Sequence, residues 1–423
     1  MNNDLFKQLA VNGGKKAIEK PLPPRGHFGA EEKAAIDRIV DDAIAQGVAP
    51  GYGGVEEAEF CKEFSEMMGG GYADAVSSGT DAVFVALRAL ELEPYTEVVV
   101  GPITDPGGMM PIVMNNCIPI VADTAPDSFN VSLQTVKAAC TPLTGAIIVP
   151  HIAGEPAEID AICDFAKQRG IKVIEDCAQA HGATLHGRPV GTFGDVMAYS
   201  MMFGKHTCMG GQGGVVFTRD EDMYWKIRRH SDRGKPFGLP DGSSNSVASL
   251  NFNADELGCA VGREQIKKTA SIAANRRRVV DIIRREIADI PAIRIPQPIE
   301  GAVPSYWFVR TLFDGSTVSC TKNEFGDALA AESNMRVLNY YPASPYTSDW
   351  YKNRNVFGTT DYPWSAPQYF GDKDKRFTLD DLPNAKKALD DNLLIYIYES
   401  WSDEDAVAVA GAIRKVYNAY KTV

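Results

Sequence analysis

Apolar side chains follow two different rhythms along this chain. Residues 31–46 repeat apolar side chains on one helical stripe, which predicts an amphipathic helix. A glycine-rich break at 51–54 separates it from a second predicted helix. The preceding segment, residues 1–25, carries Gly13-Gly14 and several prolines, so we expect it to form an N-terminal arm.

From residue 73 onward, short apolar runs alternate with helical stretches. The predicted strands are 73–76, 97–100, 119–122, 146–149 and 171–174, and the helices between them are 80–92, 111–115, 131–139 and 158–169. Continuous apolar strands that alternate with helices are typical of a parallel sheet covered on both faces. The predicted fold class is therefore α/β, with a mostly parallel central sheet in a large domain.

The C-terminal part of the chain has a different pattern. A long helix is predicted from about Asp255 to Ala288, and its Arg276-Arg277-Arg278 triplet is interpreted as a solvated face. From about residue 293, strands and helices mix, which indicates a smaller α+β domain closed by a helix at 403–421. The expected division is a 1–25 arm, a 26–260 large domain and a 261–423 small domain.

Composition narrows the function classes. The 423 residues are 44% hydrophobic, enough for two domains with full cores. The net charge of −12 argues against nucleic acid and anionic membranes as general partners. The N-terminus has no apolar signal region, and no apolar stretch approaches about 18 residues. We therefore expect a cytoplasmic protein without a membrane span.

The eight cysteines are scattered, with no C-x-x-C pair. Free thiols in a reducing cytosol explain this distribution best. The nearest metal-like spacings are His206-Thr207-Cys208 and Cys177 with His181, and neither has a second ligand pair. We therefore predict no metal site.

Two residues carry the strongest chemical signal. The apolar run Ile171-Lys172-Val173-Ile174 ends in Glu175-Asp176, which places an acid at the tip of a buried strand. Lys205 follows 29 residues later among apolar and glycine neighbours. A desolvated lysine loses its proton readily and becomes a nucleophilic amine. Together they are what pyridoxal phosphate (PLP) requires, namely a Schiff-base amine and an acid facing the pyridinium nitrogen.

A third segment, Ser77-Ser78-Gly79-Thr80-Asp81, lies between a predicted strand and a predicted helix. The free N–H groups and dipole of a helix start suit a phosphate, and Gly79 allows close approach. Taken alone, the same residues equally describe an ordinary helix cap. Gln179 could reach the phenolic oxygen of the ring, and Ser200 could add a phosphate contact; a turn-capping Asp176 and a buried Ser200 hydroxyl are the plainer alternatives.

These residues resemble the DegT/DnrJ/StrS sugar aminotransferases, a branch of the fold-type I PLP enzymes. The segments that carry the resemblance are Asn12-Gly13-Gly14, Ser78-Gly79-Thr80, 150–154, 175–183, Ser200 to Lys205, 211–214, Asn251-Phe252-Asn253 and 382–385. The resemblance implies the fold of that family. It also implies transfer of an amino group from glutamate or glutamine to a keto group of a nucleotide-linked sugar or cyclitol.

The resemblance also implies residue roles. Lys205 forms the Schiff base with PLP and moves protons, Asp176 pairs with the pyridinium, and Gln179 contacts the ring hydroxyl. The phosphate is held by Ser78, Gly79, Thr80 and Ser200. Asn251 corresponds to the asparagine that reaches the phosphate of the neighbouring subunit, so a homodimer is implied.

Three positions depart from the family pattern. The aromatic residue that usually stacks on the PLP ring, just after a threonine, is replaced by Asp105. Gln212 stands for a glutamate, and Asn253 stands where an arginine is common. These changes leave open what covers the ring and which substrate is bound.

Two other functions remain open from the sequence. A PLP sugar dehydratase has histidine in the lysine's place, and His206 is adjacent; the five-residue spacing from Ser200 favours Lys205. His206 is then expected to lie beside the site or on the surface. A non-catalytic PLP-fold sensor is the other alternative, with Asp105 as the feature in its favour.

Overall fold

A seven-stranded sheet organises the larger part of the molecule. The computed structural model describes residues 3–341 and 345–422, and the strand order of this sheet is β1-β9-β8-β5-β4-β2-β3. The strands are β1 (Tyr72–Val76), β2 (Glu97–Val100), β3 (Ile118–Val121), β4 (Thr144–Pro150), β5 (Lys172–Asp176), β8 (Val196–Ser200) and β9 (Gly214–Thr218). Only β9 runs antiparallel to its neighbours, so the predicted mostly parallel sheet is confirmed.

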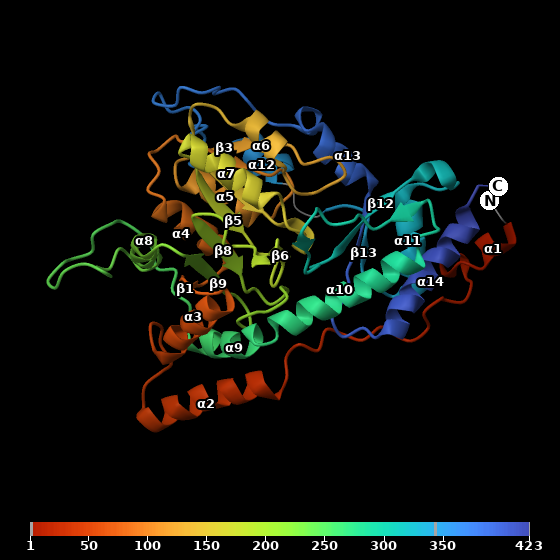
Figure 1. The fold of residues 1–423 in the computed structure, drawn as a ribbon, viewed down its shortest axis with the longest axis horizontal. Helices are drawn as coiled ribbons and strands as arrows, with labels where there is room; N and C mark the ends of the chain where they lie inside the picture. Colours follow the sequence, from red (N-terminus) through yellow and green to blue (C-terminus); the bar gives the residue numbers. More distant parts are fainter. Residues whose placement is uncertain (1–2, 342–344, 423) are drawn as a thin grey trace.

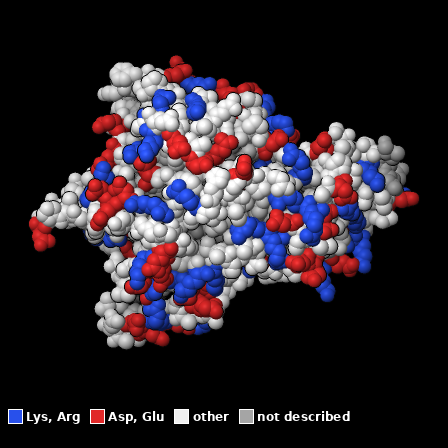
Figure 2. Space-filling model, viewed as in Figure 1, with Lys and Arg blue, Asp and Glu red and all other residues white. Residues whose placement is uncertain are grey.

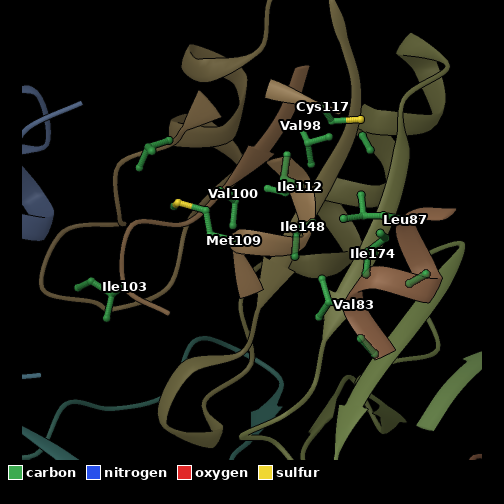
Figure 3. Close-up of a cluster of buried hydrophobic side chains, with 14 of the residues drawn as sticks. Val83, Leu87, Val98, Val100, Ile103, Met109, Ile112, Cys117, Ile148 and Ile174 are labelled. Carbon is green, nitrogen blue, oxygen red and sulfur yellow. The ribbon is translucent and has the colours of Figure 1, made fainter. Parts of the chain in front are cut away.

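Helices cover both faces of this sheet (Figure 1). They are α3 (Val55–Met67), α4 (Gly79–Ala89), α5 (Met110–Met114), α6 (Leu133–Ala139), α7 (Ile159–Arg169), α8 (Glu221–Ser231) and α9 (Glu256–Ile266), while α2 (Ala30–Gln46) packs on α9. Successive strand residues alternate between two apolar cores: Ile148 packs with α4 on one face, and Ile147 packs with α7 on the other. In Figure 3, Val83 and Leu87 of α4 point toward Ile148 and Ile174 of the sheet. Burial on both faces explains why the strands have continuous apolar sequences.

The C-terminal part contains a second sheet with its own apolar core. Its four-stranded antiparallel sheet has the order β10 (Ile293–Arg294), β12 (Val309–Phe313), β14 (Asn392–Ile395) and β13 (Val337–Leu338). The remaining helices are α1 (Asn3–Lys7), α10 (Thr269–Glu286), α11 (Lys322–Ser333), α12 (Asp349–Lys352), α13 (Pro383–Asp391) and α14 (Asp403–Tyr420). Helices α10, α11 and α14 share one core with this sheet. The α+β character predicted for this part is therefore present.

Shorter elements complete the fold. A three-stranded sheet pairs β11 (Ala302–Val303) with β6 (Thr184–Leu185) and β7 (Arg188–Pro189). The 3₁₀ helices are η1 (Ala10–Asn12), η2 (Pro106–Gly108), η3 (Ile152–Gly154), η4 (Gly315–Thr317), η5 (Pro345–Thr347) and η6 (Leu379–Asp381). The arm packs on the C-terminal part (Figure 1). There the rings of Phe6 and Tyr420 meet edge to face, with their centres 5.6 Å apart.

Two predictions about α10 are wrong. The single helix expected from Asp255 to Ala288 is broken after Ile266 by a turn at residues 267–268, where the Lys268 N–H donates to Gln265 O and its Nζ donates to Glu32. Arg276 is 1% exposed rather than solvated, since it pairs with Glu399 and donates to two backbone carbonyls. The expected domain boundary at residues 260–261 falls inside α9, and the division stays a prediction.

The surface bears out the acidic but mixed composition. Lys and Arg are interspersed with Asp and Glu over the face shown in Figure 2, without a basic stripe on that face. Within the described residues, every helix is either too short or too polar to cross a membrane.

Candidate active site

Asp176 is the last residue of β5, at the carboxyl end of a parallel strand, where α/β sheets bind ligands. Its carboxylate is buried, and Oδ1 accepts the N–H of Ala178 at 3.0 Å. Of the residues described, none donates to Oδ2. Burial raises the pKa of Asp176; the Ala178 N–H and Lys205 lower it, and Asp105 adds to the rise. The free oxygen is available to a cationic N–H.

Lys205 lies in the loop between β8 and β9, and only 6% of it is exposed. Burial lowers the pKa of its amine, against the opposing attraction of Asp176 and Asp105. The net direction is downward, so the amine is poised to lose its proton, as the sequence predicts. Its Nζ lies 4.1 Å from the centre of the Trp307 ring.

The N-terminus of α4 forms the third part of the site. Ser78 caps it by accepting the N–H of Asp81 at 3.1 Å. A side chain at Gly79 would bring its Cβ within 2.5 Å of the Ser200 Cβ, so only glycine fits there. The structure therefore brings Ser78, Gly79 and Ser200 together at a helix start whose first N–H groups have no partner inside the helix.

The segment that departs from the family pattern lies beside these groups. Asp105 is exposed and caps η2 by accepting the N–H of Gly107 at 2.9 Å. A Cβ at Gly107 would lie 2.4 Å from Thr80 Oγ1, and one at Gly108 would lie 3.2 Å from Asp176 Oδ2. This turn therefore presents backbone, rather than an aromatic side chain, to Thr80 and Asp176.

Gln179 is held on both ends of its amide. Oε1 accepts the N–H of Ala153 at 2.8 Å, and Nε2 donates to the Tyr341 hydroxyl at 3.0 Å. Ala153 takes a left-handed φ of 63°, a conformation that costs energy for a residue with a side chain. One Nε2 hydrogen remains for another acceptor, which is compatible with the role predicted for Gln179.

Asn251 lies on a segment beside the end of β1, where the Phe252 carbonyl accepts the N–H of Ser77 at 2.7 Å. It is exposed, and its Oδ1 accepts the backbone N–H of Asn253 at 3.1 Å. None of its recorded contacts is with Ser78, Gly79, Thr80 or Ser200. The single chain therefore does not unite Asn251 with the predicted phosphate site.

A buried polar cluster surrounds Glu175, the residue before Asp176 on β5. Glu175 accepts the N–H groups of Gly191, Phe193 and Gly194 at 2.6–2.7 Å, and its Oε2 lies 3.2 Å from His151 Nε2. With Cys177 these two side chains have the composition of a metal site. His151 Nδ1 already accepts the Ala157 N–H at 3.1 Å, so the donor atoms of His151 and Glu175 are engaged within the protein and the cluster positions the strand end.

His206 is fully buried, which corrects the expectation that it could lie on the surface. Its Nε2 lies 3.2 Å from the Ser305 carbonyl, and its ring lies 5.1 Å from His181. Burial lowers the pKa of His206 well below its usual value. The side chain is thus a neutral interior group.

Three residues at the site were not anticipated from the sequence. Arg25 of the arm donates to the Lys205 and His206 carbonyls, Tyr341 bonds to Gln179, and Trp307 contacts Lys205. None belongs to a local motif. Each reaches the site from more than 90 residues away in the sequence, so only the fold reveals them.

The sheet, the acid at the tip of β5, the buried lysine and the open helix start define a fold-type I PLP enzyme. The model of the DegT/DnrJ/EryC1/StrS aminotransferase family matches residues 31–369. The chain belongs to this family, and it is a PLP-dependent aminotransferase.

Curated relatives and solved structures are also similar to this chain and support its place in the aminotransferase family. GDP-perosamine synthase of Vibrio cholerae is 31% identical over 255 residues, which cover 60% of this chain and 68% of the relative. The UDP-N-acetyl-3-dehydro-alpha-D-glucosamine 3-aminotransferase of Acidithiobacillus ferrooxidans is 32% identical over 257 residues, covering 60% and 67%. The structure of S. venezuelae DesV in complex with a ketimine intermediate aligns with a TM-score of 0.79 at 25% identity, covering 94% of this chain and 99% of that one.

The residues present fit PLP. Among the described residues none donates to Asp176 Oδ2, which suits a pyridinium N–H, and Gly79 and Gly107 allow the start of α4, Ser200 and the η2 turn to lie in close contact. Lys205 supplies an amine whose pKa is already lowered. Because all three parts are preorganised, the site meets the requirements of the cofactor.

Proposed function

We propose that this enzyme takes an amino group from glutamate or glutamine and gives it to the keto group of a nucleotide-linked sugar or a cyclitol. The observation that carries the proposal is that Asp176 and Lys205 are both buried and share one site without an ion pair within 4.0 Å. The names of the similar sugar and aminoinosose aminotransferases support the substrate class.

PLP supplies an electron sink that stabilises the carbanion formed at the substrate carbon. We assign its pyridinium nitrogen to Asp176 and its carbonyl carbon to the Lys205 amine. The phosphate is assigned to Ser78, Gly79, Thr80 and Ser200, with the ring oxygen assigned to Gln179. When its amine is free, Lys205 carries a proton between the substrate carbon and the cofactor. Burial supports this role because it favours the neutral amine.

We also propose that the active unit is a homodimer. Asn251 is exposed beside Leu250, an apolar side chain that is 64% exposed. In a dimer, Asn251 would complete the phosphate site of the neighbouring subunit.

The eight free cysteines support a further proposal, that the enzyme is cytoplasmic.

The geometry favours transfer over the dehydratase alternative. His206, the histidine required for that alternative, is directed at the Ser305 carbonyl in the interior. Lys205 instead faces the space shared with Asp176. The exposed Asp105 does not by itself make the protein a sensor, because the acid and the amine of a working site are both in place.

The two half-reactions test the proposal. PLP-loaded enzyme is mixed with glutamate or glutamine, and the loss of its visible absorption band is followed. A panel of nucleotide-linked ketosugars and inososes is then added, and a true acceptor restores the band. Lys172→Ala is a control variant that should give the same spectral changes as the wild type, because this lysine is on β5 but its side chain is 47% exposed. If no donor changes the spectrum of either protein, the proposed function is wrong.

A further inference from the structure

The indole of Trp307 touches the Lys205 loop in two ways. Its Nε1–H donates to the Gly204 carbonyl at 3.0 Å. Its ring centre lies 4.1 Å from the Lys205 Nζ, within the range of a cation–π contact. One end of the side chain therefore fixes the backbone next to the lysine, while the face of the ring meets the amine.

The backbone of Trp307 is held rigidly. Its N–H donates to the Ala153 carbonyl at 2.9 Å, and its carbonyl accepts Arg276 Nη1 at 3.0 Å. Arg276 is itself buried and paired with Glu399 at 2.7 Å. The surroundings therefore determine where the indole lies.

Two left-handed residues flank this arrangement. Tyr306 has a φ of 49° and Ala153 a φ of 63°. Such conformations are unfavourable for residues with a side chain and persist where neighbouring contacts enforce them. The strained pair lies in one hydrogen-bonded ladder, since Ser305 also donates to the Gly154 carbonyl at 2.9 Å. This ladder joins Gln179, through Ala153, to Trp307.

Charged groups around Lys205 do not replace the indole. Asp176 at the tip of β5 and Asp105 on the η2 turn attract the ammonium, and His181 is the other titratable side chain that senses its charge. Within the described part of the chain, no carboxylate comes within the 4.0 Å of an ion pair with Nζ. The ring of Trp307 is therefore a direct neighbour of the amine, while the carboxylates act at longer range.

We propose that Trp307 is a positioning residue: it holds the Lys205 amine at the site whenever that amine is not bonded to the cofactor. The indole N–H anchors Gly204, and the ring face holds the ammonium against its own desolvation. The consequence for turnover rests on the proposed function. The contact itself does not, so it is tested on cofactor-free enzyme.

The test compares Trp307→Phe, which keeps a ring but loses the N–H, with Trp307→Met, which fills space without a ring. Lysines of the cofactor-free proteins are labelled by reductive ¹³C-methylation and titrated by NMR, and Lys205→Arg identifies the Lys205 resonance. Loss of the ring is expected to lower the pKa of Lys205 by about half a unit to one unit in Trp307→Met, and by less in Trp307→Phe. Trp364→Phe is the matched control, since its ring lies 4.7 Å from Arg354 and this variant should leave Lys205 unchanged.

Turnover supplies the second readout. With the loaded enzyme, kcat should fall about tenfold in Trp307→Met with KM for the donor little changed, because only the placement of the amine is lost. An unchanged Lys205 pKa in a folded Trp307→Met protein overturns the inference, and so does a shifted pKa with unchanged kcat. If wild-type enzyme transfers no amino group, the proposed function fails, but the NMR titration still decides whether the contact exists.

Discussion

The amine of Lys205 and the carboxylate of Asp176 alter each other's pKa, yet they form no ion pair within 4.0 Å. Both groups are buried, and a direct salt bridge would leave neither available to a third molecule. Their separation thus keeps a nucleophilic amine and an acceptor oxygen ready at one site. The arrangement favours a ligand that offers a carbonyl to one and a cationic N–H to the other.

Asp176→Asn tests the acid. The substitution keeps size and the Oδ1 acceptor for Ala178, but it removes the charge facing the cofactor nitrogen. Turnover measured with the best donor and acceptor should fall about 100-fold or more, as on loss of one electrostatic stabiliser. Asp105→Asn is the control, because Asp105 is exposed and should cost much less. Near-normal turnover in Asp176→Asn would reduce this acid to a capping residue.

Gly79→Ala tests the helix start. Its new Cβ would lie 2.5 Å from that of Ser200, so the two chain segments must separate. Overpacking of this kind costs about 1–3 kcal/mol, which corresponds to a roughly 5- to 150-fold weaker PLP affinity when it acts at the phosphate site. PLP titration of the cofactor-free protein measures the affinity. Gly411→Ala is the control, since its Cβ meets open space; equal affinities in both variants would contradict the assignment.

The pH dependence of covalent PLP capture follows from Lys205. Its pKa is lowered, mainly by burial, and the neutral amine is the reactive form. The capture rate of cofactor-free enzyme should therefore rise with pH and level off below 10.5, the usual value for lysine. Asp176 raises the pKa of Lys205, so Asp176→Asn should move the profile to lower pH. An unchanged profile would show that this acid does not act on the amine, and a shift to higher pH would contradict the direction of its effect.

Complementation between two inactive variants tests the homodimer. Lys205→Ala lacks the amine, and Asn251→Ala lacks the proposed contact to the partner's phosphate site. A hybrid dimer carrying one variant in each chain contains one site with both residues, and random reassortment makes about half of the dimers hybrid, so mixing after reversible dissociation should restore about a quarter of the activity. Hybrids with no activity, or a fully active monomer in light scattering, would exclude sharing of the site.

Local patterns were sufficient for much of the fold. The strand and helix alternation from β1 to β5 was predictable because each strand is buried on both faces and each helix has one apolar stripe. The break between α9 and α10 was not, since no local signal marks the turn, where Lys268 contacts Glu32, more than 200 residues away in the sequence. Arg276 was misjudged for the same reason: its partner Glu399 lies on a distant segment.

The site residues also divide into those with a local sequence signal and those placed only by the fold. Asp176, Lys205 and the cap at Ser78 were predictable, because each lies in a motif whose chemistry is local. Trp307 and Tyr341 were not, since a lone aromatic residue in the C-terminal part carries no local signal. The absence of an aromatic side chain at Asp105 was visible in the sequence, while the close approach of Gly107 to Thr80 required the structure.

The most direct test of the account is to find which lysine binds the cofactor. PLP-loaded enzyme is reduced with borohydride and digested, and the modified peptide is sequenced by mass spectrometry. We expect the label on Lys205, in the peptide that follows Ser200, and we expect Lys205→Ala to bind PLP through its phosphate contacts without covalent attachment. A label on any other lysine, or covalent attachment that survives in Lys205→Ala, would contradict the account.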